Sequence, residues 1–216
     1  CWIDWTVRRI PTTSARKTEY MAIGIDVTAQ RRIRAEEKLG YNRRRRSEVF
    51  NDAITKQLSN EALNTAAKQI GLEIAESFVC LVFLADEFIL PTNSDADSIE
   101  RQYLQNRLID SLCNDEGRLA WQTPEGIAVL QTVVAEKGPV SPKQTVLLAA
   151  KAMERLKLNG TNLSVRCGVS HPAGSLTTLA ELYAQSLAAA RYGPTLLGPH
   201  DIYSLKELGS LQFNVR

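Results

Sequence analysis

The feature that most constrains this chain is an unbroken apolar run, FVCLVFLA, at residues 78–85. Successive side chains of a β-strand point to opposite faces of its sheet, so a half-buried strand alternates apolar and polar residues. A strand that is apolar at every position is typical of the centre of a sheet whose two faces are both covered. The run therefore predicts a central strand with other elements packed on both of its sides.

Helical and strand-like patterns alternate after this run. The predicted elements are a helix to about residue 114, strands at 118–121 and 127–134, a helix from Ser141-Pro142, a strand at 163–170, a helix from Ser175 to Gly193-Pro194, and a short strand near 202–203. This order predicts an α/β (α+β) fold, in which helices pack on a mixed sheet.

The helix that ends near residue 114 is predicted to begin at a capping box formed by Asp97 and Glu100. Apolar side chains recur along it at helical spacing, so they should form its buried face. These side chains are Ile99, Tyr103, Leu104, Leu108 and Leu112.

The first 28 residues read differently. Residues 2–10 and 19–27 alternate in the period of half-buried strands and predict a β-hairpin. Two strands are marginally stable alone, so the hairpin is expected to be the trailing edge of a larger domain. The chain also starts inside a strand and without a methionine, and we expect it to be a piece of a longer protein.

Residues 29–58 predict a long helix, because they are rich in Arg, Glu, Lys, Ala and Leu and follow Thr28, a suitable N-cap. The arginines at 43–46 point all round such a helix and are interpreted as a solvated or inter-helix charged face. A thin apolar stripe cannot bury itself on its own chain, so the helix is expected to pair with a second copy in a homodimer. The stripe is Ile33, Leu39, Val49, Phe50, Ile54 and Leu58. The predicted domains are thus 1–28, 29–58 and 59–216.

Bulk composition excludes several classes of protein. Lys and Arg exceed Asp and Glu by two, so there is no overall basic field typical of a nucleic-acid coat. The four cysteines are widely spaced and form no C-x-x-C pair, which favours free thiols in a reducing compartment, the cytoplasm by default. The sequence has no apolar stretch of about 20 residues, so no membrane span is predicted.

Two stretches resemble known families. WTVRRI followed by YMAIGIDVTAQRRIRAEEKL looks like the last strands of a PAS domain, the Asp-Val-Thr junction and a signalling helix. The segments AAKQIGLEIAESFVCLVFL, PEGIAVLQTV, LSVRCGVSHPAGSLTTLAELYAQSLAAARYG and DIYSLKELGSLQF are similar to the GGDEF-like domain of PucR/CdaR-type bacterial transcription regulators. This resemblance implies a nucleotidyl-cyclase-like fold and a parent with a C-terminal helix-turn-helix, so DNA would be bound only outside this chain.

A working diguanylate cyclase needs glycines at its central hairpin, for close approach to the nucleotide, and carboxylates that hold a metal ion. If Ile127 takes the place of the motif's phenylalanine, Thr123 and Pro124 replace both glycines, Glu125 follows, and Gly126 replaces the metal-binding carboxylate. The turn is therefore degenerate, and neither an enzyme nor a cofactor or metal site is predicted. With two histidines, His171 and His200, the sequence has no histidine metal cluster.

Asp26 and Thr28 are the candidate signalling joint, where an acid and a hydroxyl could change hydrogen bonds and reorient the helix. Together these features predict a non-catalytic signal-transmission module, whose small-molecule effector would bind the missing part of the PAS domain. Two alternatives remain open. One is a divergent nucleotide cyclase or phosphodiesterase that uses Asp86, Glu87 and Glu125 with magnesium, and the other is a nucleotide-binding domain without turnover.

Overall fold

The computed structural model describes residues 1–10, 19–74, 77–86, 95–113, 117–133, 140–158, 163–173 and 177–208. The chain divides into two compact units, Cys1–Arg44 and Arg45–Arg216. The helix α1 (Thr28–Thr55) runs through the boundary. The predicted domain limits at residues 28 and 58 therefore stay a prediction, and each unit is described by itself.

The first unit contains the predicted hairpin. Strands β1 (Ile3–Ile10) and β2 (Glu19–Asp26) pair antiparallel from Ile3 with Asp26 to Ile10 with Glu19. Within the described residues, large apolar side chains of this hairpin stay exposed, including Trp2, Trp5, Val7, Tyr20 and Ile25. This is the surface expected of a sheet fragment that needs further structure to cover it.

The second unit is built on a mixed sheet. In the described part of the chain this sheet has five strands in the order β4-β5-β3-β6-β7. Their bounds are β3 (Phe78–Ala85), β4 (Arg118–Gln122), β5 (Ile127–Thr132), β6 (Val165–Val169) and β7 (Ile202–Ser204). β6 and β7 are parallel, whereas the other neighbours are antiparallel. The central position of β3, buried at every residue, is confirmed.

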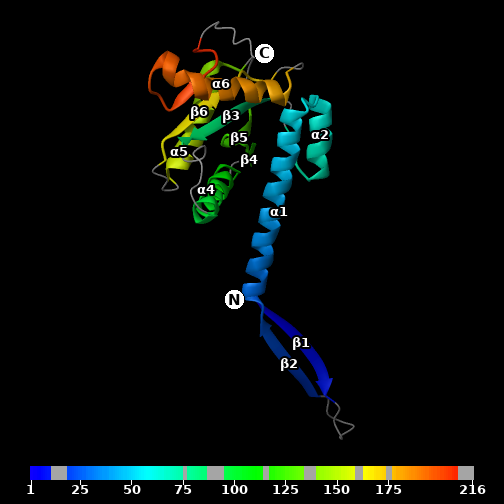
Figure 1. Cartoon of the computed structure of the whole chain (residues 1–216). Helices are drawn as coiled ribbons and strands as arrows, with labels where there is room; N and C mark the ends of the chain where they lie inside the picture. The colour runs from blue at the N-terminus through cyan, green and yellow to red at the C-terminus, as the bar shows by residue number, and fades with distance from the viewer. Residues whose placement is uncertain are drawn as a thin grey trace. The chain divides into compact units, whose positions relative to one another are not determined.

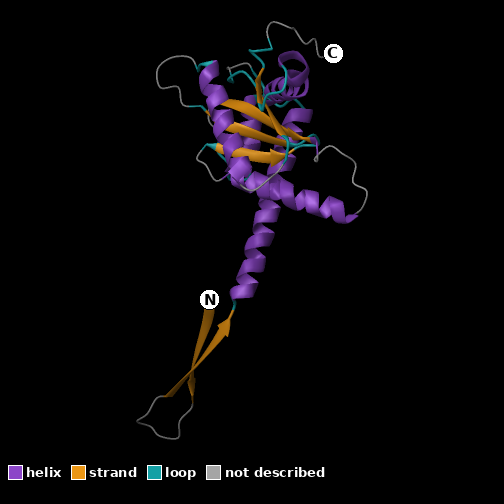
Figure 2. Cartoon of the chain, turned by 90° about the vertical axis from the view of Figure 1, so that its left-hand side faces the viewer, coloured by secondary structure: helices purple, strands orange, loops and turns teal. Residues whose placement is uncertain are grey.

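Helices cover both faces of this sheet (Figures 1 and 2). α4 (Asp95–Cys113) and α5 (Pro142–Leu158) pack against the face that carries Val79, Leu81 and Phe83 of β3. α2 (Asn60–Gln69), α6 (Leu179–Leu197) and the end of α1 pack against Cys80, Val82 and Leu84 on the opposite face. The predicted α/β architecture is confirmed, because alternate side chains of one strand enter two separate cores.

α6 lies unusually close to the sheet at β6. A Cβ atom added to Gly168 would lie 1.9 Å from the carbonyl oxygen of Ser186. The Ser186 hydroxyl donates to the carbonyl oxygen of Cys80 at 2.7 Å, which fixes the same helix to β3. This packing sets the position of α6, on which part of the site below depends.

Three predictions about α4 are wrong, namely the cap at Asp97 and the burial of Ile99 and Tyr103. α4 begins at Asp95, so Asp97 lies inside the helix and does not cap it. Ile99 and Tyr103 are 72% and 71% exposed among the described residues, because the buried face of α4 is carried by its last turns. Leu108 and Leu112 are buried there as predicted.

The last helix also differs from the expectation. Its N-cap is Thr178, which forms a capping box with Glu181, so α6 starts at Leu179 and not at Ser175, which lies outside the described residues. It continues past Gly193-Pro194 to Leu197. Pro194 has no N–H to donate to the carbonyl oxygen four residues before it, so α6 lacks one hydrogen bond in its last turns.

Candidate functional site

β4 is an edge strand, and the end of α1 lies along it. An edge strand leaves alternate N–H and C=O groups without a neighbouring strand. In β4 these groups belong to every second residue, Arg118, Ala120 and Gln122. At Ala120 and Gln122, side chains take the place of the missing strand.

Ala120 is held from two helices. Its N–H donates to the sulfur of Cys113 at 3.4 Å, and its C=O accepts from Nη1 of Arg46 at 3.1 Å. The backbone of Gln122 is held from α1, because its N–H donates to Oγ of Ser47 at 3.2 Å and its C=O accepts from Nδ2 of Asn51 at 3.0 Å, while its side-chain amide donates to Oε1 of Gln105 on α4 at 2.8 Å. We call these four side chains, Arg46, Ser47, Asn51 and Cys113, the β4 clasp.

An aromatic pair reinforces the clasp. Phe50 of α1 stacks on Trp121 of β4, with ring centroids 4.7 Å apart and planes inclined by 24°. Both side chains are fully buried. Arg46 does not belong to a solvated face and fits the inter-helix part of the interpretation, since its guanidinium bonds Cys113 at the end of α4 at 2.8 Å and also Ala120.

The end of α1 thus packs on its own chain, and this corrects part of the predicted dimer stripe. Phe50 is fully buried, Ile54 and Leu58 pack against the same core cluster, and Val49 is half-buried. α1 also ends at Thr55, before Leu58. Ile33 and Leu39, in the first unit, are 56% and 51% exposed, and their role in pairing stays a prediction.

The predicted degenerate turn directly follows β4, the strand that the clasp holds. Thr123 closes it, because its N–H donates to the carbonyl oxygen of Gly126 at 2.9 Å and its Oγ1 accepts from the Gly126 N–H at 3.1 Å. Thr123 is buried, whereas Pro124, the next residue of the turn, is exposed. Gly126 has no room for a side chain, since an added Cβ would lie 2.3 Å from the carbonyl oxygen of Phe83.

Glu125, in the same turn, is bound to α6. The Tyr183 hydroxyl donates to Oε2 of Glu125 at 2.7 Å, and Nη2 of Arg191 lies 3.8 Å from Oε1. Burial raises the pKa of Tyr183, and the nearby Glu125 carboxylate raises it further, so the phenol keeps its proton and remains a donor. The Glu125 carboxylate is therefore engaged with the protein itself.

The other acids of the magnesium alternative are not assembled with Glu125 in the described structure. Oδ1 of Asp86 forms an ion pair with Nη2 of Arg166 at 2.8 Å, and Glu87 lies outside the described residues. No group of three or more His, Cys, Asp or Glu able to hold a metal ion occurs in the part of the chain that is described. His171 and His200 lie outside helices and strands.

The predicted joint of Asp26 and Thr28 is brought together in the first unit. Oδ1 of Asp26 accepts from the Thr28 N–H at 2.9 Å, and Oγ1 of Thr28 accepts from the Trp2 N–H at 2.7 Å. Hydrogen bonds from Thr28, first its side chain and then its amide, hold the pKa of Asp26 below its ordinary value. Asp26 thus caps the first turn of α1, and Thr28, expected to be the cap, is the first helical residue.

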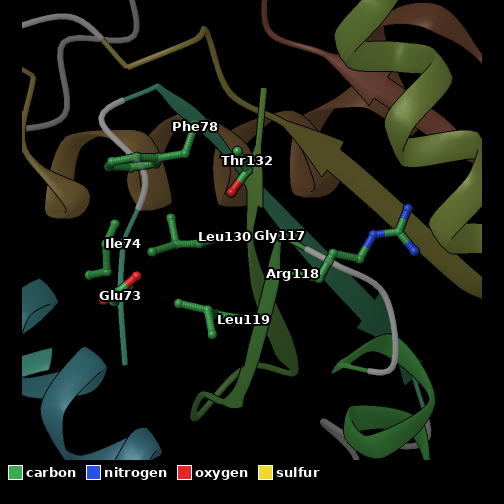
Figure 3. Close-up of a pocket in the computed structure, with 8 residues that line it drawn as sticks. All are labelled: Glu73, Ile74, Phe78, Gly117, Arg118, Leu119, Leu130 and Thr132. Carbon is green, nitrogen blue, oxygen red and sulfur yellow. The ribbon is translucent and has the colours of Figure 1, made fainter. Parts of the chain in front are cut away.

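A small pocket lies at the other end of the β4–β5 hairpin (Figure 3). Its volume is about 110 Å³. Ile74, Phe78, Leu119 and Leu130 line it, while the Arg118 side chain points away and bonds Gln131. Sites for small molecules usually measure roughly 300–1,000 Å³, so this pocket is too small for a nucleotide.

Sequence reasoning missed the clasp residues Ser47, Asn51 and Cys113 and the partners of Glu125 on α6. Ser47 and Asn51 are spaced i, i+4 beside Phe50, which was the available signal that this side of α1 meets protein. Nothing in the sequence connected that side with residues 113–122. Within the described residues, no helix combines the length and the apolar character needed to span a membrane.

Comparison with protein families matches residues 55–192, more than half of the chain, to the family described as GGDEF-like domain. The match starts at the last residue of α1 and ends within α6, so it includes the β4–β5 turn and Tyr183. Comparison with curated proteins gave no significant match.

Proposed function

Because the chain belongs to the GGDEF-like domain family, we propose that it is a non-catalytic signal-transmission and dimerisation module of a bacterial transcription regulator. The observation that carries the proposal is the course of α1. This helix starts at the joint of Asp26 and Thr28, and its last turns hold the edge strand that leads into the degenerate turn. A shift at the joint thereby has a covalent path to the domain.

The state of the turn supports a non-catalytic role. Glu125 is bonded by Tyr183 and faced by Arg191, whose positive charge opposes the binding of a metal ion at the same carboxylate. Thr123 occupies the turn's interior where a cyclase has backbone open to the nucleotide. Both features disfavour the alternative of a divergent nucleotide cyclase.

We further propose that the first unit is the tail of a PAS domain, as the resemblance of residues 1–40 implies. Its exposed apolar strands fit a sheet that is completed by preceding residues, where a small-molecule effector would bind. The parent would be a PucR/CdaR-type cytoplasmic regulator, with DNA contacted by a helix-turn-helix outside this chain. A homodimer would form through the exposed part of α1, with Ile33 and Leu39 at its contact.

Incubation with GTP or ATP and magnesium tests the non-catalytic role, with product nucleotides measured by chromatography. We expect no turnover by the chain and no difference from its Glu125→Ala variant. Turnover that Glu125→Ala abolishes would establish the enzyme instead. Calorimetric titration with cyclic dinucleotides checks the binding-domain alternative. A saturable heat of binding would favour a ligand-sensing domain over the proposed signal-transmission module.

A further inference from the structure

The β4 clasp contains an unusual concentration of unsatisfied polar atoms. Among the described residues, three buried side-chain nitrogen or oxygen atoms have no hydrogen-bond partner, and two of them, Nε of Arg46 and Nε1 of Trp121, belong to this contact. Buried polar atoms without partners are rare in folded proteins, because they lose their hydrogen bonds to water and gain none. The desolvation of these two atoms therefore lowers the stability of the contact between α1 and β4.

We propose that the last turns of α1 are a removable cover of the β4 edge, and that uncovering this edge is the conformational change by which the domain is switched. The inference rests on the proposed function, because it specifies what a signal arriving along α1 would do. In the covered state, side chains of α1 bond the C=O of Ala120 and both backbone groups of Gln122, while Cys113 of α4 accepts from the Ala120 N–H. In the released state, Ala120, Gln122 and Trp121 are exposed.

The chemistry of the contact suits a reversible cover. α1 supplies three side-chain hydrogen bonds to β4 and no strand-like backbone ladder, so few bonds have to break together. Release also returns Nε of Arg46 and Nε1 of Trp121 to water, which offsets part of the lost contacts. The stack of Phe50 on Trp121 opposes release and keeps the covered state as the resting state.

The contact involves residues that a helix movement would displace together. Arg46, Ser47, Phe50 and Asn51 occupy about one and a half turns of α1, so a rotation or a shift of the helix along its axis moves all of them. Water or an incoming extended strand then has to take over the bonds at Ala120 and Gln122.

Cys113 provides a direct probe of the cover, because its sulfur touches both Arg46 and Ala120. Cys80 and Cys167 are buried, and burial raises the pKa of both thiols, so neither reacts unless the core opens. Cys1 is exposed and is removed by Cys1→Ser. In this background the rate of thiol alkylation reports on Cys113 alone.

The test compares the alkylation rate in the full chain carrying Cys1→Ser with that in the same chain carrying Ser47→Ala and Asn51→Ala. We expect labelling of Cys113 to accelerate about tenfold, because two of the bonds holding the cover are lost, while Cys80 and Cys167 remain unlabelled. Asp52→Ala is the matched control, since this exposed neighbour pairs with Lys56 and leaves the clasp intact, and its rate should match the background.

An unchanged rate in the double variant overturns the proposal. Simultaneous labelling of all three thiols in the double variant and in Asn51→Ala alone also overturns it, because α1 would then be an inseparable part of the core. The result separates from that of the proposed function. Nucleotide turnover would contradict the non-catalytic role but would not bear on the cover. An unchanged alkylation rate would contradict the cover but would not bear on the signalling role.

Discussion

Single residues decide how closely α6 can approach the sheet. Gly168 faces the backbone of α6, and the Ser186 carbonyl oxygen and the Ala190 nitrogen would lie 1.9 Å and 2.6 Å from an added Cβ. Both atoms belong to backbone and cannot rotate away. α6 in turn carries Tyr183, whose bond to Glu125 holds the degenerate turn.

Gly168→Ala should therefore destabilise the second unit by about 1–3 kcal/mol, because α6 has to move away from β6. Urea denaturation followed by tryptophan fluorescence measures the effect. Gly40→Ala is the matched control, since nothing lies within 4 Å of its added Cβ. That variant should stabilise α1 by about 0.5–1 kcal/mol. Equal stability of Gly168→Ala and the parent chain would contradict the close packing.

The buried thiols should make the second unit lose stability in alkaline solution. Burial raises the pKa of Cys80 from 9.0 to about 12, and it raises the pKa of Cys167 too. The unfolded chain releases these protons at a lower pH than the folded chain, so the stabilisation is full below about pH 9 and falls as the pH rises toward about 12.

Urea midpoints measured between about pH 8 and about pH 11 should decline for this reason, and more steeply in the parent chain than in Cys80→Ala. The comparison uses the slope with pH, because the lost sulfur also lowers the midpoint at every pH. Parallel slopes for the two proteins would show that Cys80 does not titrate in the way its burial requires.

At the scale of elements, α1 has two different halves. Its last turns are anchored in the chain's own core by Phe50, whereas Leu39 in the first unit remains exposed. The apolar stripe, which is continuous in the sequence, thus lies in two environments. Substitutions in its buried part should change the stability of the second unit, whereas substitutions in its exposed part should change dimer association.

Phe50→Ala should destabilise the second unit by about 3–5 kcal/mol, because it removes the aromatic stack on Trp121 and leaves a cavity. Leu39→Ala should change stability by less than about 0.5 kcal/mol and should weaken the proposed dimer. Denaturation and a light-scattering concentration series measure the two effects. If Leu39→Ala leaves the mass unchanged and Phe50→Ala alone dissociates the protein, the division of α1 is wrong.

Local patterns predicted most of the elements but not their contacts. The apolar run at 78–85 placed β3 at the centre of the sheet, and Ser141-Pro142 correctly marked the start of α5, where Ser141 and Gln144 exchange hydrogen bonds. Periodicity failed at Ile99 and Tyr103, because apolar spacing shows which side of a helix is apolar and not how far the neighbouring elements extend. The clasp joins residues 46–51 with 113–122, and such a long-range meeting leaves no local signature.

At the scale of the whole molecule, the joint of Asp26 and Thr28, α1 and the clasp form a continuous series of connections. α1 begins at this joint and runs into the second unit. There the clasp holds β4, the strand before the degenerate turn. Each connection is a set of hydrogen bonds between named atoms. Signal transmission along α1 therefore requires that a change in the hydrogen bonds of the joint also changes the hydrogen bonds of the clasp.

Amide hydrogen exchange in Asp26→Ala tests this requirement most directly. The Thr28 amide loses its acceptor and should exchange faster, which verifies that the joint has been disturbed. The account predicts that the Gln122 amide, bonded to Ser47, then also exchanges faster, while amides of the central strand such as that of Leu81 keep their rates. An unchanged rate at Gln122, with the Thr28 amide clearly accelerated, would contradict transmission along α1.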